Sequence, residues 1–401
     1  MTRPHARLSA SGAHRWYHCP GSVTLEESFP DRGSVYAAEG TLAHDLAEMI
    51  LRERFGHITR EQYEMMRVEH RKKFDDLQAR ITADGHPPLD SYENMERYVR
   101  RYVSEVYASE ISAGENSLLY IEERVDFSPW VPEGFGTADC VLLDPTLGEL
   151  TVMDLKYGKG VPVDAEDNLQ LALYALGAYR HLRLLCDINH VIMEIVQPRL
   201  EVVSQWRITD KELLAIGEKI KPVAKEAFEG TDRLCEGEHC RFCKAKARCP
   251  ERARAMFSAV EEVKAEKAPE LLTPDAMGDY LAKCEGVTAW IKDLEEEALK
   301  QILSGQSVAG YKAVEGRSNR KITDEKGLAN ALMAKGYEEA MIYKPKALET
   351  LTNLERLVGK KDFAALSEGM VAKPKGKPTL VPETDKRPPY VEEAMFEKVE
   401  D

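Results

Sequence analysis

The chain has no hydrophobic run of about 18 residues, so no membrane-spanning helix is expected. Nothing resembling a signal peptide opens it, which predicts a reducing, cytoplasmic location and argues against disulfides among its eight cysteines. It also has no excess of positive charge, since 69 acidic residues against 55 basic ones give a formal net charge of −14. A uniformly basic nucleic-acid-binding surface is therefore excluded, and contacts with phosphate must come from local basic patches.

Two short segments carry the side chains that metal-dependent phosphodiester cleavage needs. Asp139 ends one segment, and Asp154 and Lys156 flank Leu155 in the next. Carboxylates at neighbouring points bind Mg²⁺ or Mn²⁺, which polarises the scissile phosphate and yields hydroxide near neutral pH. On a strand Asp154 and Lys156 point to one face, so the lysine can orient or deprotonate the attacking water. The Leu155 backbone carbonyl is a further candidate ligand. The alternative is an ordinary exposed ion pair.

Two helical segments supply further candidates. A helix expected from about residue 38 to 54 contains Gly40-Thr41-Leu42-Ala43-His44, which presents His44 as a metal ligand or, alternatively, as a hydrogen-bonded structural histidine. A later helix, expected over residues 164–184, places Gln170 and Tyr174 on one face. The glutamine amide can bind water or phosphate, and the tyrosine hydroxyl can steady the lysine or simply cap a core aromatic. Glu123, on the first expected strand, is a weaker candidate near the site.

Together these motifs resemble the PD-(D/E)XK superfamily, in particular its RecB-like group, which includes the CRISPR-associated RecB-type nucleases and the AddB nuclease domain. The resemblance covers roughly residues 8–255, and many relatives carry Glu where Asp154 stands. It implies a magnesium- or manganese-dependent nuclease with an α/β core of the order αβββαβ, a mixed central sheet flanked by helices. The matching positions are His44, Asp139, Asp154 with Lys156, and Gln170 with Tyr174.

The cysteines form a second pattern. Cys240, Cys243 and Cys249 have metal-ligand spacing, C-x2-C-x5-C, and lack a fourth thiolate. In the RecB-like nucleases that contain a 4Fe–4S cluster, one N-terminal cysteine joins three C-terminal ones, and this resemblance implies that Cys19 completes the set as a structural clasp. The spacing alone leaves a local zinc site open, with Cys235 as the fourth ligand.

Basic residues gather at two places that are candidates for nucleic-acid binding by charge and stacking. One lies among the cysteines, and the other follows an expected short strand at residues 308–314. For both, an ordinary solvated surface is the alternative. The candidate residues are Lys244, Lys246, Arg248, Arg317, Arg320 and Lys321.

The hydrophobic pattern predicts an α/β core and then a mostly helical region. Residues 57–90 are charged and are expected to be irregular, and a helix is expected over 91–112. The expected strands of the core cover residues 118–127, 135–143, 149–157, 190–197 and 202–208, with a helix over 210–228 after them.

The 401 residues and their 43% hydrophobic content predict several domains with a substantial core. We expect a nuclease domain with its cysteine clasp at 1–258, a mostly helical accessory domain at 259–370 that binds DNA or a partner, and a Pro/Lys-rich extended or disordered tail at 371–401.

The arrangement resembles phage and prophage proteins related to RecB-like nucleases. This resemblance implies a DNA exonuclease that resects ends during phage recombination or replication in the cytoplasm of a bacterial host, with a phage single-strand annealing or binding protein as a partner. A catalytically inert DNA-binding or recruitment module and a flap or structure-specific endonuclease remain alternatives. Cleavage polarity, strand preference and self-association into a homo-oligomer are left open.

Overall fold

The computed structural model describes residues 6–30, 35–83, 88–114, 116–160, 162–265 and 273–314. Contacts divide the chain into two units, Met1–Ala313 and Val314–Asp401, and all that follows concerns the first. The boundary expected at residues 258/259 stays a prediction, although helix α8 (Pro250–Ala265) runs across that position. Within the described part of the chain, no helix is both long and apolar enough to cross a membrane.

A five-stranded mixed sheet forms the centre of this unit, in the spatial order β1-β2-β3-β4-β5. The first three strands form an antiparallel meander, β4 pairs with β3 in parallel, and β5 returns antiparallel to β4. A parallel neighbour needs a crossover, and helix α6 (Leu169–Leu182) provides it. The predicted α/β class with a mixed, helix-flanked sheet is thus confirmed. The strands are β1 (Leu118–Asp126), β2 (Phe135–Asp144), β3 (Glu149–Leu155), β4 (His190–Gln197) and β5 (Val202–Thr209).

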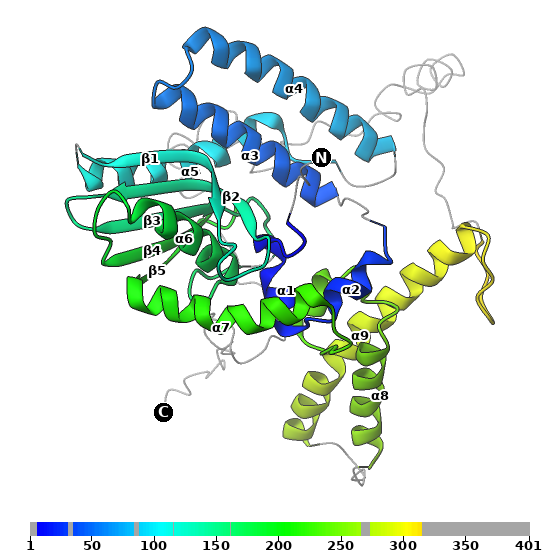
Figure 1. The fold of residues 1–401 in the computed structure, drawn as a ribbon. Helices are drawn as coiled ribbons and strands as arrows, with labels where there is room; N and C mark the ends of the chain where they lie inside the picture. Colours follow the sequence, from blue (N-terminus) through cyan, green and yellow to red (C-terminus); the bar gives the residue numbers. More distant parts are fainter. Residues whose placement is uncertain are drawn as a thin grey trace, which may run out of the picture. The chain divides into compact units, whose positions relative to one another are not determined.

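Each face of the sheet has its own hydrophobic core. On one face, apolar side chains of β2, β3 and β4 pack with α6, α7 (Asp210–Glu229) and the N-terminal elements η1 (Ala10–Gly12) and α1 (Ala13–His18). On the other face, they pack with α3 (Val35–Arg54), α4 (Arg60–Ala83) and α5 (Tyr92–Ala113). Figure 1 shows α3 and α4 as two blue helices running side by side. The remaining helices are α2 (Ser22–Glu27), η2 (Glu238–Phe242) and α9 (Pro274–Leu303).

Helix α4 corrects the expectation that residues 57–90 are irregular. The helix is highly charged, yet it buries one apolar stripe that includes Tyr63, Phe74, Leu77 and Ile81. Successive positions are 11, three and four residues apart, which keeps them on one side of a helix. The many charged residues around this stripe are typical of a loop, but here they form ion pairs on the surface of the helix.

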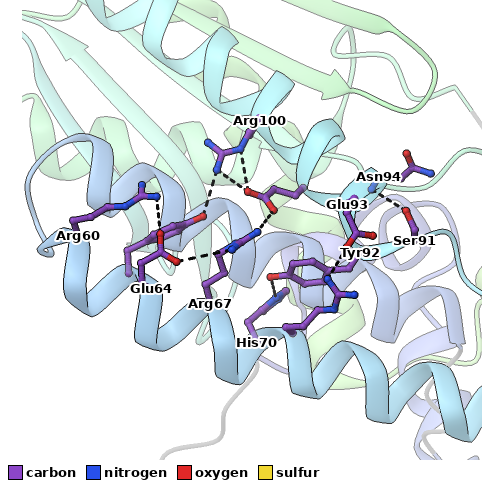
Figure 2. A network of polar contacts seen from close by, with 12 residues as sticks. Arg60, Glu64, Arg67, His70, Ser91, Tyr92, Glu93, Asn94 and Arg100 are labelled. Atoms are coloured by element: carbon purple, nitrogen blue, oxygen red, sulfur yellow. Dashed lines mark hydrogen bonds and ion pairs between the residues drawn. The ribbon is translucent and has the colours of Figure 1, made fainter. Parts of the chain in front are cut away.

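Polar contacts join α4 to its neighbours, as Figure 2 shows. Arg67 binds Glu96 of α5 at 2.8 Å. The buried His70 ring lies 2.8 Å from the Leu42 carbonyl through Nε2 and 3.0 Å from the Tyr92 hydroxyl through Nδ1. A carbonyl only accepts, so Nε2 carries the proton and Nδ1 accepts from Tyr92. His70 therefore anchors α3 two residues before His44.

The strand expected at residues 308–314 does not form. Gly305 and Gly310 have φ angles of +89° and +79°, which turn the chain, and the Tyr311 amide donates back to the Val308 carbonyl. Tyr311 is exposed. Alternating apolar residues without a neighbouring sheet edge to pair with do not make a strand.

Candidate functional site

Asp154 and Lys156 meet at the end of β3, as the acid-x-Lys spacing predicts. Asp154 is only 2% exposed, and its Oδ2 lies 2.8 Å from Lys156 Nζ. Leu155 is the last residue of the strand, and the Lys156 amide still donates to the Val196 carbonyl of β4. The backbone of Lys156 is thus fixed just beyond the end of β3, and its ammonium group points at the buried Asp154 carboxylate.

Helix α6 brings Gln170 and Tyr174 to this pair. Asn168 caps the helix by accepting from the Leu171 amide, so Gln170 lies in the first turn. Its Oε1 accepts from Lys156 Nζ at 2.8 Å, and its Nε2 donates to Asp154 Oδ1 at 3.0 Å. The same amide lies 3.3 Å from the Tyr174 hydroxyl. The predicted Gln-x-x-x-Tyr residues therefore form one hydrogen-bonded chain with the acid and the lysine.

Gly136 has a packing role in this arrangement. A Cβ atom at this position would lie 2.8 Å from Cε1 of Tyr174, closer than side-chain carbons approach. The bare backbone of β2 thereby lets the tyrosine ring lie against the sheet, three residues before Asp139.

His44 and Asp139 form a second pair beside the first. His44 Nδ1 lies 3.1 Å from Asp139 Oδ1, and Asp139 Oδ2 accepts from the Leu155 amide at 2.7 Å. Asp139 thus connects helix α3 to the end of β3. Leu155 contributes its amide to this contact, and the ligand role predicted for its carbonyl stays a prediction.

Glu122 is a functional candidate that the sequence analysis missed. Ligand atoms of His44, Glu122 and Asp139 all lie within 4.8 Å of one another, and this is the one such trio of potential metal ligands found in the described ranges. The strand pairs on either side, Ile121 with Cys140 and Glu123 with Ala138, bring Glu122 next to Asp139. Asp154 is not a member of this candidate metal group, because its oxygens face Lys156 and Gln170.

The backbone explains why Glu122, and not Glu123, reaches the site. Glu122 has φ +52°, in the left-handed region that a non-glycine residue rarely adopts. Before it, Ile121 packs in the core of the α3 face, whereas after it Val125 packs in the core of the α6 face. Regular alternation would put the side chains of Ile121 and Val125 on the same face of the sheet. The alternation of side chains between the two faces is therefore interrupted at Glu122. Glu123, the weaker candidate, instead lines a cavity of about 330 Å³ between β1 and α6.

Burial and crowded carboxylates set the proton affinities of the site. Burial raises the pKa of Asp154, against the effect of Lys156. Burial, followed by the nearby Asp139, raises the pKa of Glu122 to about 8. Burial opposes protonation of His44, but the charge and hydrogen bond of Asp139 outweigh it and raise that pKa to about 9. A divalent cation would compensate this concentration of negative charge, so the donor set fits Mg²⁺ or Mn²⁺.

The structure brings the N-terminal and C-terminal cysteines together. The Cys235 amide donates to Cys19 Sγ at 3.3 Å, and the Gly21 amide donates to the Arg233 carbonyl at 3.0 Å. Nearby, the Lys244 amide donates to the buried Glu26 carboxylate at 2.7 Å. Cys19, Cys240 and Cys243 are buried, while Cys235 and Cys249 are half-buried. We call these five residues the cysteine clasp.

His239 lies inside the clasp. Hydrogen bonds to the side chains of Cys19 and Cys240 raise its pKa to about 10, and its Nε2 donates to the Cys235 carbonyl at 2.9 Å. Burial opposes ionisation of Cys19, but the His239 bond and the Cys235 amide lower its pKa. Its environment thus favours the thiolate, the form that binds iron or zinc.

The spacing of the thiols bears on which metal would fit. Thiolates around one zinc ion lie about 3.8 Å apart, given Zn–S bonds of about 2.3 Å. No three cysteines in the described part of the chain bring their sulfur atoms within 4.8 Å of one another. The cysteines of the described residues are therefore not arranged as a preformed zinc site.

The basic residues near the clasp have different partners. Lys246 binds Asp293 of α9 at 2.7 Å, and Arg252 binds the same carboxylate at 2.6 Å. Lys246 is thus held in a partly buried ion pair, and the DNA-binding role predicted for it stays a prediction. Arg248 instead lies 5.5 Å from the centre of the Phe29 ring and stays exposed. The second basic candidate group, Arg317, Arg320 and Lys321, and the tail at 371–401 lie outside the described residues.

A comparison with protein families assigns the chain to a family. A family model described as "Protein of unknown function (DUF2800)" matches residues 5–388. The match covers the candidate metal group, the acid-x-Lys pair and the cysteine clasp. Its description assigns no activity, so function has to be argued from the site itself.

Proposed function

The chain belongs to the DUF2800 family, and we propose that it is a magnesium- or manganese-dependent deoxyribonuclease with a PD-(D/E)XK core. One observation carries the proposal: the candidate metal group of His44, Glu122 and Asp139 lies directly beside the Asp154–Lys156 pair. The Asp139 carboxylate joins them, since it contacts His44 through one oxygen and the Leu155 amide through the other. Acids, an imidazole and a lysine gathered at one place are the groups that metal-dependent phosphodiester hydrolysis uses.

The residues divide into two roles. His44, Glu122 and Asp139, with Asp154 beside them, would hold the cation, which when bound supplies Lewis-acid activation of the phosphate and of water. Lys156 orients the attacking water and stabilises negative charge on the phosphate. Gln170 bonds both Lys156 and Asp154 and therefore fixes their separation. Tyr174 steadies this glutamine from the next helical turn.

Element order supports the proposed core. A histidine-bearing helix, three antiparallel strands, a helix and a parallel strand follow one another as α3, β1–β3, α6 and β4, with α4 and α5 inserted after the first helix. The acids occupy β2 and the end of β3, as in the resemblance described from the sequence. We further propose that the enzyme degrades DNA from its ends in phage recombination or replication, in the cytoplasm, with a single-strand annealing or binding protein as partner.

The cysteine clasp supports a 4Fe–4S cluster held by Cys19, Cys240, Cys243 and Cys249. Because these residues come from both ends of the nuclease core, the cluster would tie α1 to the segment before α8 and act as a structural element. Anaerobic purification tests it. A brown protein with broad visible absorbance and about four iron atoms per chain is expected, and a colourless protein with stoichiometric zinc contradicts the assignment.

Timed digestion of end-labelled linear DNA and of circular DNA, in Mg²⁺, Mn²⁺ and EDTA, tests the activity. We expect metal-dependent loss of linear DNA and persistence of covalently closed circles. Cleavage of circles would indicate an endonuclease instead. Binding without any cleavage in either metal would indicate an inert recruitment module.

A further inference from the structure

Two arginine–phenylalanine pairs lie beside the cysteine clasp. The guanidinium of Arg241 lies 5.7 Å from the centre of the Phe242 ring. Arg248 lies 5.5 Å from the ring of Phe29, which comes from the other end of the core. Phe242 is 72% exposed, whereas Phe29 is half-buried. The clasp thus presents an uncovered aromatic ring with positive charge next to it.

The exposure of Phe242 is built into the fold. Its neighbours Cys240 and Cys243 are each 8% exposed, and the Cys243 amide donates to the Cys240 carbonyl at 3.1 Å. This turn holds both thiols inward, and the two residues between them, Arg241 and Phe242, are exposed. Single exposed apolar side chains are common on protein surfaces, so what distinguishes Phe242 is its fixed position with Arg241 beside it.

Some basic side chains of this segment form ion pairs with carboxylates within the fold, and others do not. Lys246 and Arg252 share Asp293, and Arg254 pairs with Glu251. Neither Arg241 nor Arg248 forms an ion pair with a carboxylate in the described part of the chain, and both are exposed. On a chain with a net charge of −14, two such arginines in one short segment are a local exception, and Arg241 lies beside the exposed ring of Phe242.

We propose that Phe242, with Arg241 beside it and Arg248 in the same segment, forms a stacking platform for single-stranded DNA. Every base has an aromatic face, so a ring and planar guanidinium groups bind a strand without reading its sequence. The arginines also attract phosphate where the rest of the chain repels it. The platform deepens the proposed nuclease function, since an enzyme acting at DNA ends meets unpaired strands, and it names single-stranded DNA as the ligand.

Fluorescence anisotropy with labelled oligo(dT) and the full-length protein in EDTA tests the platform without cleavage. Phe242→Ala should weaken binding about 5- to 100-fold, the range expected for loss of one stacked base. Phe242→Trp should restore binding, and on addition of oligo(dT) its fluorescence should fall by more than that of the parent, which has four tryptophans of its own. The matched control is Phe257→Ala, which removes another exposed ring that packs against Trp290 at 5.5 Å and should leave binding unchanged.

Two results would overturn the platform. One is equal affinity of the parent and Phe242→Ala proteins for oligo(dT), with no change in fluorescence of the tryptophan variant. The other is equal affinity of the parent for oligo(dT) and for an abasic strand of the same length, because phosphate contacts alone would then explain binding. Loss of cleavage in Asp154→Ala is measured separately, so failure of the nuclease proposal leaves this result interpretable.

Discussion

Glu122 allows the candidate metal group to be tested without measuring catalysis. The folded protein holds its carboxyl proton up to about pH 8, whereas an unfolded chain releases it near 4.5. Folded-state stability should therefore fall as pH rises between these values. At about 1.4 kcal/mol for each tenfold change in proton affinity, the full effect is about 5 kcal/mol. Because Glu122 is only half-buried, screening by solvent reduces this contribution to the free energy of unfolding to about 1–2 kcal/mol.

Glu122→Gln keeps the shape of the side chain and removes its charge. In EDTA, urea unfolding should show this variant to be about 1–2 kcal/mol more stable than the parent at pH 8.5 and equal to it at pH 4.5. Added Mn²⁺ should stabilise the parent and have a smaller effect on the variant. Glu122→Gly should also gain about 1 kcal/mol in EDTA, since glycine adopts φ +52° without strain.

Glu123→Gln is the matched control, because this neighbour lines the cavity on the α6 side of β1. It should leave both the pH slope and the Mn²⁺ effect at the parent's level. If Glu122→Gln unfolded with the parent's pH dependence, or if Mn²⁺ stabilised the two proteins equally, Glu122 would not belong to the metal group.

Three further predictions concern parts of the fold that hold the site in place. Arg199 forms a buried ion pair of 3.0 Å with Glu39 of α3, and the two side chains are 6% and 7% exposed. Arg199→Met leaves the Glu39 charge buried without its partner and should lower the free energy of unfolding in urea by about 3–5 kcal/mol. A decrease below about 1 kcal/mol would refute this prediction. Burial lowers the pKa of His70, so its contribution to stability is complete above pH 6.5 and is lost as pH falls through the folded-state value, and His70→Gln should flatten this acid limb of thermal unfolding. Cys19→Ser should lose visible absorbance and iron, whereas Cys284→Ser, at an exposed thiol on α9, should retain both.

The sequence was informative where local pattern and chemistry agree. Strand alternation, the acid-x-Lys spacing and the four-residue spacing of Gln170 and Tyr174 each constrain geometry within one or two elements, and these residues meet as expected. Helix α4 was missed because its buried stripe is narrow and its charges resemble those of a loop. Residues 308–314 were misassigned because alternation alone does not provide a strand partner.

Glu122 could not be predicted for a different reason. Regular alternation puts Ile121 and Glu123 on one face and Glu122 on the other, but the left-handed backbone at Glu122 changes the facing along the strand. A single unusual φ angle is set by tertiary packing and leaves little trace in a strand-like sequence. The ion pair between Lys246 and Asp293 likewise depends on how α9 packs, which its own sequence does not reveal.

The measurement that tests the central claim most directly is digestion of end-labelled linear duplex DNA in Mg²⁺ by the parent and by Asp154→Ala. Asp126→Ala, at an exposed carboxylate paired with Arg180 at the end of β1, controls for loss of a surface acid. A metal-dependent nuclease predicts that the parent and Asp126→Ala digest the duplex and that Asp154→Ala slows at least 100-fold, in line with the loss of a group that acts in the transition state. Digestion by Asp154→Ala at the parent's rate would contradict the assignment of this site.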